Sequence, residues 1–154
     1  MSSSNQSFNE LDDIYQDIII DHYRRPRNKV NIPDPDLFSR GFNPFCGDEV
    51  TLMITLATKN QIKAIGFTGQ GCSISQASAS ILTELIKGKS LKEIVEISDV
   101  FRNLVKGLAV SDEDLDKLGE LEALKGVSKF PVRIKCALLP WSTLEDAISK
   151  NKDL

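Results

Sequence analysis

The stretch VTLMITLATKNQIKAIGFTG, residues 50–69, decides the fold that we expect for this chain. In its first half, valine, leucine and isoleucine alternate with threonine and methionine, and this two-residue period is typical of a half-buried strand. Lys59 and Asn60 suit a hairpin turn, so residues 61–69 return as a second, antiparallel strand. The segment DLFSRGF, residues 36–42, is a candidate for a third strand beside them.

Helical patterns lie on both sides of this hairpin. The segment LDDIYQDIIIDHYRR, residues 11–25, carries an apolar stripe at helical spacing, and Pro26 ends it. Downstream, Ser73 and Ser90 are each followed three residues later by a glutamine or glutamate, which predicts a capping box at two helix starts. Gly88 suits the end of the first of these two helices.

The C-terminal part of the chain also reads as helical. We expect a helix over residues 98–107, one or two short surface helices in the acidic segment 110–126, and a last helix over 136–150. Pro140 marks either the beginning of that last helix or a kink within it. Because the strands come first and most helices follow, the sequence predicts an α+β fold, with a small three-stranded antiparallel sheet covered by helices.

The composition is that of one ordinary globular domain. Hydrophobic side chains make up 41% of the 154 residues and charged ones 27%, which is enough apolar material for a core. We therefore expect a single domain over residues 1–154, with residues 1–8 as a disordered lead. The net charge of −3 argues against nucleic acid or an anionic membrane surface as a partner.

Targeting and redox signals point to the cytoplasm. No apolar run is long enough to cross a bilayer. The start, MSSSNQSFNELDD, lacks the basic and apolar regions of a secretory signal. The three cysteines cannot all pair with one another, as expected where thiols stay reduced.

The three cysteines are the candidate functional residues, since each lies at a junction between predicted elements. Cys46 stands in NPFCGD before a strand, Cys72 in GQGCSIS before a helix, and Cys136 in RIKCALL near the last helix. A helix start favours the thiolate of Cys72, and thiolate is the form that binds metals and attacks sulfur. With Asp48 as fourth ligand they make a tetrahedral zinc site, or hold iron, and a carboxylate ligand favours a site that can open. Gly47 gives the backbone beside Cys46 unusual freedom.

Each of these residues also has a simpler interpretation. A free cysteine is often only a small buried apolar side chain. His22, the only histidine, lies beside the apolar stripe of the first helix, and we expect it to pack rather than to bind metal. Arg133 and Lys135 flank Cys136; they hold an anion or stabilise a thiolate, or are solvated surface charges.

Three segments, NPFCGD, GQGCSISQASAS and RIKCALLPW, resemble the cysteine motifs of the IscU-type iron–sulfur cluster assembly proteins. The resemblance is stronger to the zinc-containing SufU branch, because LDDIYQDIIIDHYRRPRN and LEALKGVSKFPVRIKCA are also similar to it. It covers nearly the whole chain and implies the small SufE/IscU-like α+β fold. It also implies a zinc ion held by Cys46, Asp48, Cys72 and Cys136.

The resemblance further implies a function. Cys46 would accept persulfide sulfur from a cysteine desulfurase of the SufS type, which depends on pyridoxal phosphate, and would pass it to the downstream SUF assembly proteins. This is a sulfurtransferase-type activity. Two departures separate the chain from the IscU branch: Lys135 stands where IscU proteins carry a histidine, and the segment around residues 101–122 is longer.

Three functional hypotheses therefore remain open at the level of the sequence. In the first, the protein is a zinc-dependent sulfur carrier. In the second, the same four ligands hold iron or a transient [2Fe–2S] cluster, and the protein is a scaffold that hands the cluster to apo-proteins. In the third, zinc only stabilises a protein-interaction module.

Overall fold

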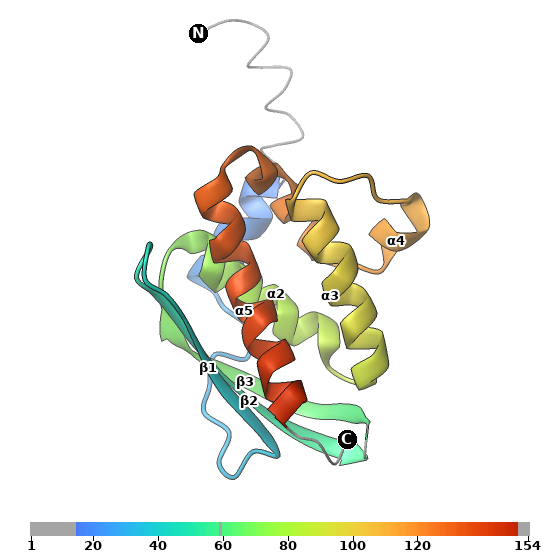
Figure 1. Ribbon diagram of the computed structural model, residues 1–154. Coiled ribbons are helices and arrows are strands. Elements are labelled where there is room, and N and C mark those ends of the chain that lie inside the picture. Colours follow the sequence, from blue (N-terminus) through green and yellow to red (C-terminus); the bar gives the residue numbers. More distant parts are fainter. Residues whose placement is uncertain (1–14, 59, 151–154) are drawn as a thin grey trace, which may run out of the picture.

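The computed structural model describes residues 15–58 and 60–150, which form a three-stranded sheet with helices packed on one face (Figure 1). The first helix covers residues 15–24 of the described part and stops before Pro26, as predicted. Its expected beginning at residues 11–14, the lead over residues 1–8 and Lys59 of the turn lie outside the described residues. In the described part, no helix has the length and apolar character needed to cross a membrane.

The sheet confirms the predicted hairpin and the third strand. Strands β1 (Leu37–Asn43), β2 (Asp48–Thr58) and β3 (Gln61–Gln70) lie in the order β1-β2-β3, and both pairs are antiparallel. The last β1–β2 pair, Asn43 opposite Asp48, closes the short connection that carries Cys46. The strand register therefore fixes the two ends of the connection that carries Cys46.

The two faces of the sheet differ in what covers them. Leu52, Ile54 and Phe67 point to the helices and are fully buried. Met53 points the other way, as the alternation requires, yet it is also buried. The N–H of Ile32 approaches its sulfur at 3.5 Å, because the connection from the first helix crosses the outer face.

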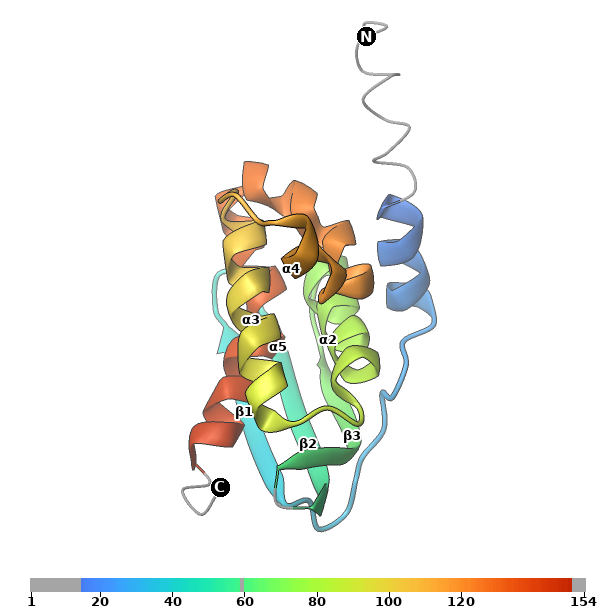
Figure 2. The same ribbon diagram turned by 90° about the vertical axis from the view of Figure 1, so that its right-hand side faces the viewer.

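Helix α2 (Ser73–Ile86) packs against β3 on the inner face of the sheet, whereas α3 (Leu91–Val105) packs against the last helix and the segment that precedes it (Figure 2). The predicted capping box at Ser73 is wrong: Cys72 is the N-cap of α2, and no side chain caps it. The predicted box at Ser90 is confirmed, with both reciprocal hydrogen bonds to Glu93. The separate helix expected over residues 98–107 is also wrong, because no glycine or proline interrupts α3 before it ends.

The acidic segment forms α4 (Asp112–Asp116) and the 3-10 helix η1 (Gly119–Lys129). These are two short helices, as predicted, but they are not merely a surface feature. Leu118, Leu121 and Leu124 are fully buried in the core. The leucines decide the packing of this segment, while most of its acidic side chains are exposed.

The last helix, α5 (Pro131–Lys150), begins earlier than predicted and runs through Pro140. Its first residue is a proline, which is favoured at that position because the N–H there has no helical partner. Pro140 has no N–H either, so the carbonyl of Cys136 receives no helical hydrogen bond from it. Trp141 lies fully buried on the next position, with its ring centroid 5.6 Å from that of Phe101.

Candidate metal centre

The end of the sheet where β1 connects to β2 brings Cys46 and Asp48 together. Cys46 lies in the connection over residues 44–47, and Gly47 adopts a φ of +69°, a left-handed conformation that glycine takes without strain. Asp48, the first residue of β2, is fully buried. One thiol therefore sits on a short loop, next to a carboxylate fixed at the start of a strand.

Cys72 reaches the same place from the N-terminus of α2. Its backbone N–H donates to Oδ1 of Asp48 at 2.8 Å, and its Sγ lies 4.0 Å from Oδ2. Gly71 makes this approach possible, since a Cβ at that position would lie 2.4 Å from Oδ1 of Asp48. The glycine found in the motif is thus required by the closeness of a strand and a helix start.

Cys136 enters from α5, across the sheet. Its side chain is buried, and its Sγ lies 3.2 Å from the Sγ of Cys46. One ligand atom each of Cys46, Asp48 and Cys136 lie within 4.8 Å of one another. The structure therefore brings together three of the four candidate ligands in one tight group, with Cys72 in contact with Asp48 at its edge.

The donor set fits a tetrahedral metal ion. Metal–ligand bonds of roughly 2.0–2.3 Å place the ligand atoms of such a site roughly 3.3–3.8 Å apart, close to the separations that these side chains show. Within the described part of the chain, Asp48 has no ion-pair partner. A buried carboxylate beside three sulfur atoms is costly without a cation, and a bound metal ion would supply one.

The surroundings of the thiols shape their charge. Burial, together with hydrogen bonds that the thiol donates to Cys46 and Asp48, raises the pKa of the Cys136 thiol far above its ordinary value. The charge of Cys72 and a hydrogen bond to Cys136 raise the pKa of Arg133, so its guanidinium stays charged beside these thiols. Lys135, also a candidate for support, instead places its ammonium 4.6 Å from the ring centroid of Phe45.

A groove of about 1120 Å³ leads to this group of residues. Its lining is mostly apolar and comes from the first helix, the start of α2, the end of η1 and the start of α5. Cys46, Cys72 and Arg133 line it, whereas Cys136 does not. A partner segment that enters the groove therefore meets two of the three thiols.

Sequence analysis did not assign a role at the site to two further polar residues, Ser75 and Asn43, and placed His22 in the packing of the first helix. The Oγ of Ser75 accepts a hydrogen bond from the Sγ of Cys72 at 3.9 Å. Asn43 contacts Cys136, and only its place before Pro44 in the first motif could have drawn attention to it. His22 is buried, bonded through Nδ1 to Ser80 at 2.8 Å and through Nε2 to Glu120 at 2.9 Å, in the packing role predicted for it.

These features define a class: a small α+β domain that carries a thiol–carboxylate centre at the end of its sheet where β1 connects to β2. The chain belongs to the family described as the NifU-like N-terminal domain, whose model matches residues 14–137. The resemblance to IscU-type proteins that the cysteine motifs indicated is thereby confirmed.

Individual relatives agree with this assignment. The chain is 44% identical to the zinc-dependent sulfurtransferase SufU of Bacillus subtilis, over 95% of this chain and 97% of that one. It is 35% identical to the iron–sulfur cluster assembly scaffold protein IscU of Streptococcus pyogenes serotype M1, over 94% and 89% of the two chains. A crystal structure of a proposed SUF-system scaffold protein from Fervidobacterium islandicum superposes with a TM-score of 0.79, at 34% identity, over 85% and 93% of the chains.

Proposed function

We propose that this protein is a zinc-dependent sulfur carrier for iron–sulfur cluster assembly. It takes persulfide sulfur from a cysteine desulfurase of the SufS type and passes it to downstream SUF proteins, acting in the cytoplasm as a single domain over residues 1–154. The similarity to the Bacillus subtilis sulfurtransferase supports this reading, because it extends over nearly the whole of both chains.

One observation carries the proposal: Cys46 is the thiol that belongs to the tight ligand group and also lines the groove. Cys136 belongs to the group but does not line the groove, and Cys72 lines the groove but stands outside the group. Cys72 is also held by the bond from its N–H to Asp48, whereas Cys46 sits on a loop with Gly47 beside it. Cys46 is therefore the sulfur acceptor that we propose.

Cys46, Asp48, Cys72 and Cys136 are the residues that would hold zinc. Zinc supplies a positive charge that keeps bound thiols deprotonated at neutral pH. Arg133 adds a second cation beside Cys72 and Cys136. Lys135 supports the site indirectly, because its ammonium lies against the ring of Phe45, the residue before Cys46.

The chemistry is an exchange at sulfur without net oxidation. The Cys46 thiolate attacks the outer sulfur of the donor's cysteine persulfide, and a new S–S bond forms on Cys46. The bond between that outer sulfur and the donor's own sulfur breaks, and the donor leaves as a thiolate. Arg133, which faces the groove, is placed to offset the negative charge of the donor thiolate.

The test mixes zinc-loaded and zinc-stripped protein separately with a cysteine desulfurase and cysteine. We expect the zinc form to speed alanine production and to gain sulfur on Cys46, read by mass spectrometry. Cys46→Ser and Cys72→Ser form a matched pair, since each loses one ligand but only the first loses the acceptor. Full sulfur transfer by Cys46→Ser would rule out this assignment.

A second candidate function is that of a scaffold. Four donors of this kind also suit a labile [2Fe–2S] cluster as cargo, and the relative from Streptococcus pyogenes is named a scaffold. Anaerobic reconstitution with iron and sulfide distinguishes the two, because a scaffold would emerge with a bound cluster and a sulfur carrier without one.

The third candidate, a structural zinc module, finds less support. The core draws on the sheet and on α2, α3, η1 and α5, so the fold does not depend on the thiol group for its apolar contacts. A metal-stripped protein that unfolds outright would favour this module over the carrier.

A further inference from the structure

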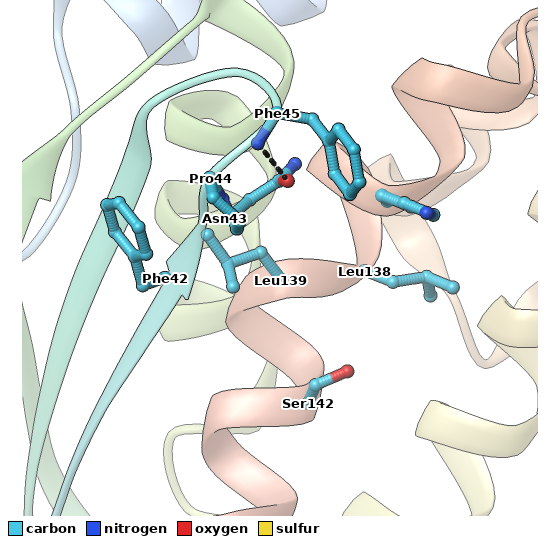
Figure 3. A pocket seen from close by; sticks show the side chains of 8 residues that line it. Phe42, Asn43, Pro44, Phe45, Leu138, Leu139 and Ser142 are labelled. Atoms are coloured by element: carbon cyan, nitrogen blue, oxygen red, sulfur yellow. Dashed lines mark hydrogen bonds between the residues drawn. The ribbon is translucent and has the colours of Figure 1, made fainter.

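Asn43 is a buried polar residue that ties two parts of the thiol group together. It is the last residue of β1, stands opposite Asp48 in the sheet, and is 6% exposed. In Figure 3 it lies between the connection that carries Phe45 and the helix that carries Leu138 and Leu139. It is therefore anchored in the sheet while it faces both the loop that carries Cys46 and α5.

Both ends of the Asn43 amide are used. Its Oδ1 accepts a hydrogen bond from the backbone N–H of Phe45 at 3.2 Å, drawn in Figure 3. Its Nδ2 donates to the Sγ of Cys136 at 3.8 Å. The Phe45 N–H can pair only with an oxygen, so the amide has one possible orientation, with its donor toward the sulfur.

The two contacts act on the two thiols that lie 3.2 Å apart. The bond to Phe45 fixes the backbone one residue before Cys46, and the bond to Cys136 places a donor against the buried sulfur. Hydrogen bonds from outside a ligand set orient the ligands and offset their charge, and their loss lowers metal affinity by about 10–100-fold.

We propose that Asn43 is a positioning residue of the metal centre, which holds the Cys46 loop and stabilises the Cys136 thiolate through one amide. The inference rests on the function proposed above, in which both thiols bind zinc and Cys46 moves to take sulfur. Asn43 and Asp48 are then the two fixed ends of the loop, and Gly47 is its joint. Cys136 keeps its donor while Cys46 moves.

Two variants separate the halves of this role. Asn43→Asp keeps an oxygen for the Phe45 N–H but loses the donor to Cys136, and Asn43→Ala loses both. Ser39→Ala is the matched control: Ser39 lies on the same face of β1, is buried, and donates to Asp146 on α5 far from the thiols. Thermal unfolding first establishes that each variant is folded.

Three measurements follow on the folded variants. We expect zinc release to a chelator to become about 10–100-fold faster in Asn43→Ala and Asn43→Asp and to stay unchanged in Ser39→Ala. In cobalt-substituted protein, the thiolate-to-cobalt absorption should move to longer wavelength in the two Asn43 variants only. In metal-free protein, the Phe45 amide should exchange hydrogen faster in Asn43→Ala but not in Asn43→Asp.

The inference would be overturned if both Asn43 variants released zinc at the wild-type rate and kept the wild-type cobalt absorption wavelength. It would also be overturned if Ser39→Ala released zinc as fast as the Asn43 variants. Failure of the proposed function is a different result, namely wild-type protein that retains no zinc. In that case the hydrogen-exchange rate of the Phe45 amide in metal-free protein still tests the inference. An unchanged rate in Asn43→Ala would show that Asn43 does not hold the loop that carries Cys46.

Discussion

Asp48→Asn is the sharpest perturbation of the metal centre, because it changes charge with almost no change in shape. Asp48 is fully buried, and its Oδ1 accepts the N–H of Cys72 at 2.8 Å. The amide keeps an oxygen for that bond and loses the negative charge. The variant should therefore have opposite effects on the metal-free and the zinc-bound protein.

In the metal-free protein, the change removes a buried carboxylate that has no ion-pair partner among the described residues. We expect the free energy of unfolding to rise by about 1–2 kcal/mol, because a neutral amide is less costly to bury than an unpaired carboxylate. For a chain of this size, that is a Tm higher by roughly 2–8 °C.

In the zinc-bound protein, the change removes one of the four proposed ligands. Loss of a residue that only hydrogen-bonds to a ligand can lower metal affinity by roughly 100-fold. Loss of a direct ligand should lower the zinc affinity by at least that factor. At saturating free zinc, a 100-fold weaker affinity removes about 2.7 kcal/mol of stabilisation by the metal. The rise in Tm on adding zinc should therefore shrink by roughly 5–11 °C.

The assay is thermal unfolding of zinc-stripped and zinc-saturated protein, followed by circular dichroism, with the zinc content after gel filtration. Asp36→Asn is the control, since Asp36 also accepts a backbone N–H, that of Leu56 at 2.7 Å, but lies exposed at the far end of β1. A less stable metal-free Asp48→Asn protein whose Tm still rises as much on adding zinc would contradict this prediction and would leave Asp48 with a structural role only.

Two further predictions concern other groups. Burial raises the pKa of the Cys136 thiol, so the metal-free protein holds that proton at neutral pH and zinc binding expels it. Through Cys136, the affinity for zinc should therefore rise about tenfold per pH unit between about pH 6 and 8. Competition with a chelator measures this affinity, and an affinity that does not change with pH would contradict the prediction. His22→Ala should lower the free energy of unfolding by about 2–3 kcal/mol, because Ser80 and Glu120 lose a buried partner, while zinc content stays at the wild-type level. Chemical denaturation measures the first effect, and loss of zinc from the folded variant would contradict the second.

The local pattern of the sequence was sufficient for the sheet and for most helix positions. The alternation over residues 50–56 and the turn residues after it predict β2 and β3, because side chains in a strand alternate between two faces. The cap at Ser90 was predictable for a similar reason, since a capping box involves only residues within one turn. These features depend on neighbours in the chain.

Three differences from the sequence-based expectations arise where distant contacts decide. Cys72 rather than Ser73 is the N-cap of α2, because the backbone N–H of Cys72 donates a hydrogen bond to Asp48 at the start of β2. The early start of α5 and its passage through Pro140 depend on packing against the sheet, which outweighs the missing N–H. The burial of η1 likewise comes from leucines that reach a core built by the whole chain.

From the sequence alone, three cysteines and an aspartate could be proposed to carry the chemistry, because their motifs place them at the ends of predicted elements. How these residues meet depends on the tertiary fold. It places Sγ of Cys136 3.2 Å from Sγ of Cys46, across 90 residues of chain, and leaves Cys136 out of the groove while Cys46 lines it. The physical reason is that a sheet register and a helix packed across it set these distances, and neither is encoded by the residues around any one cysteine.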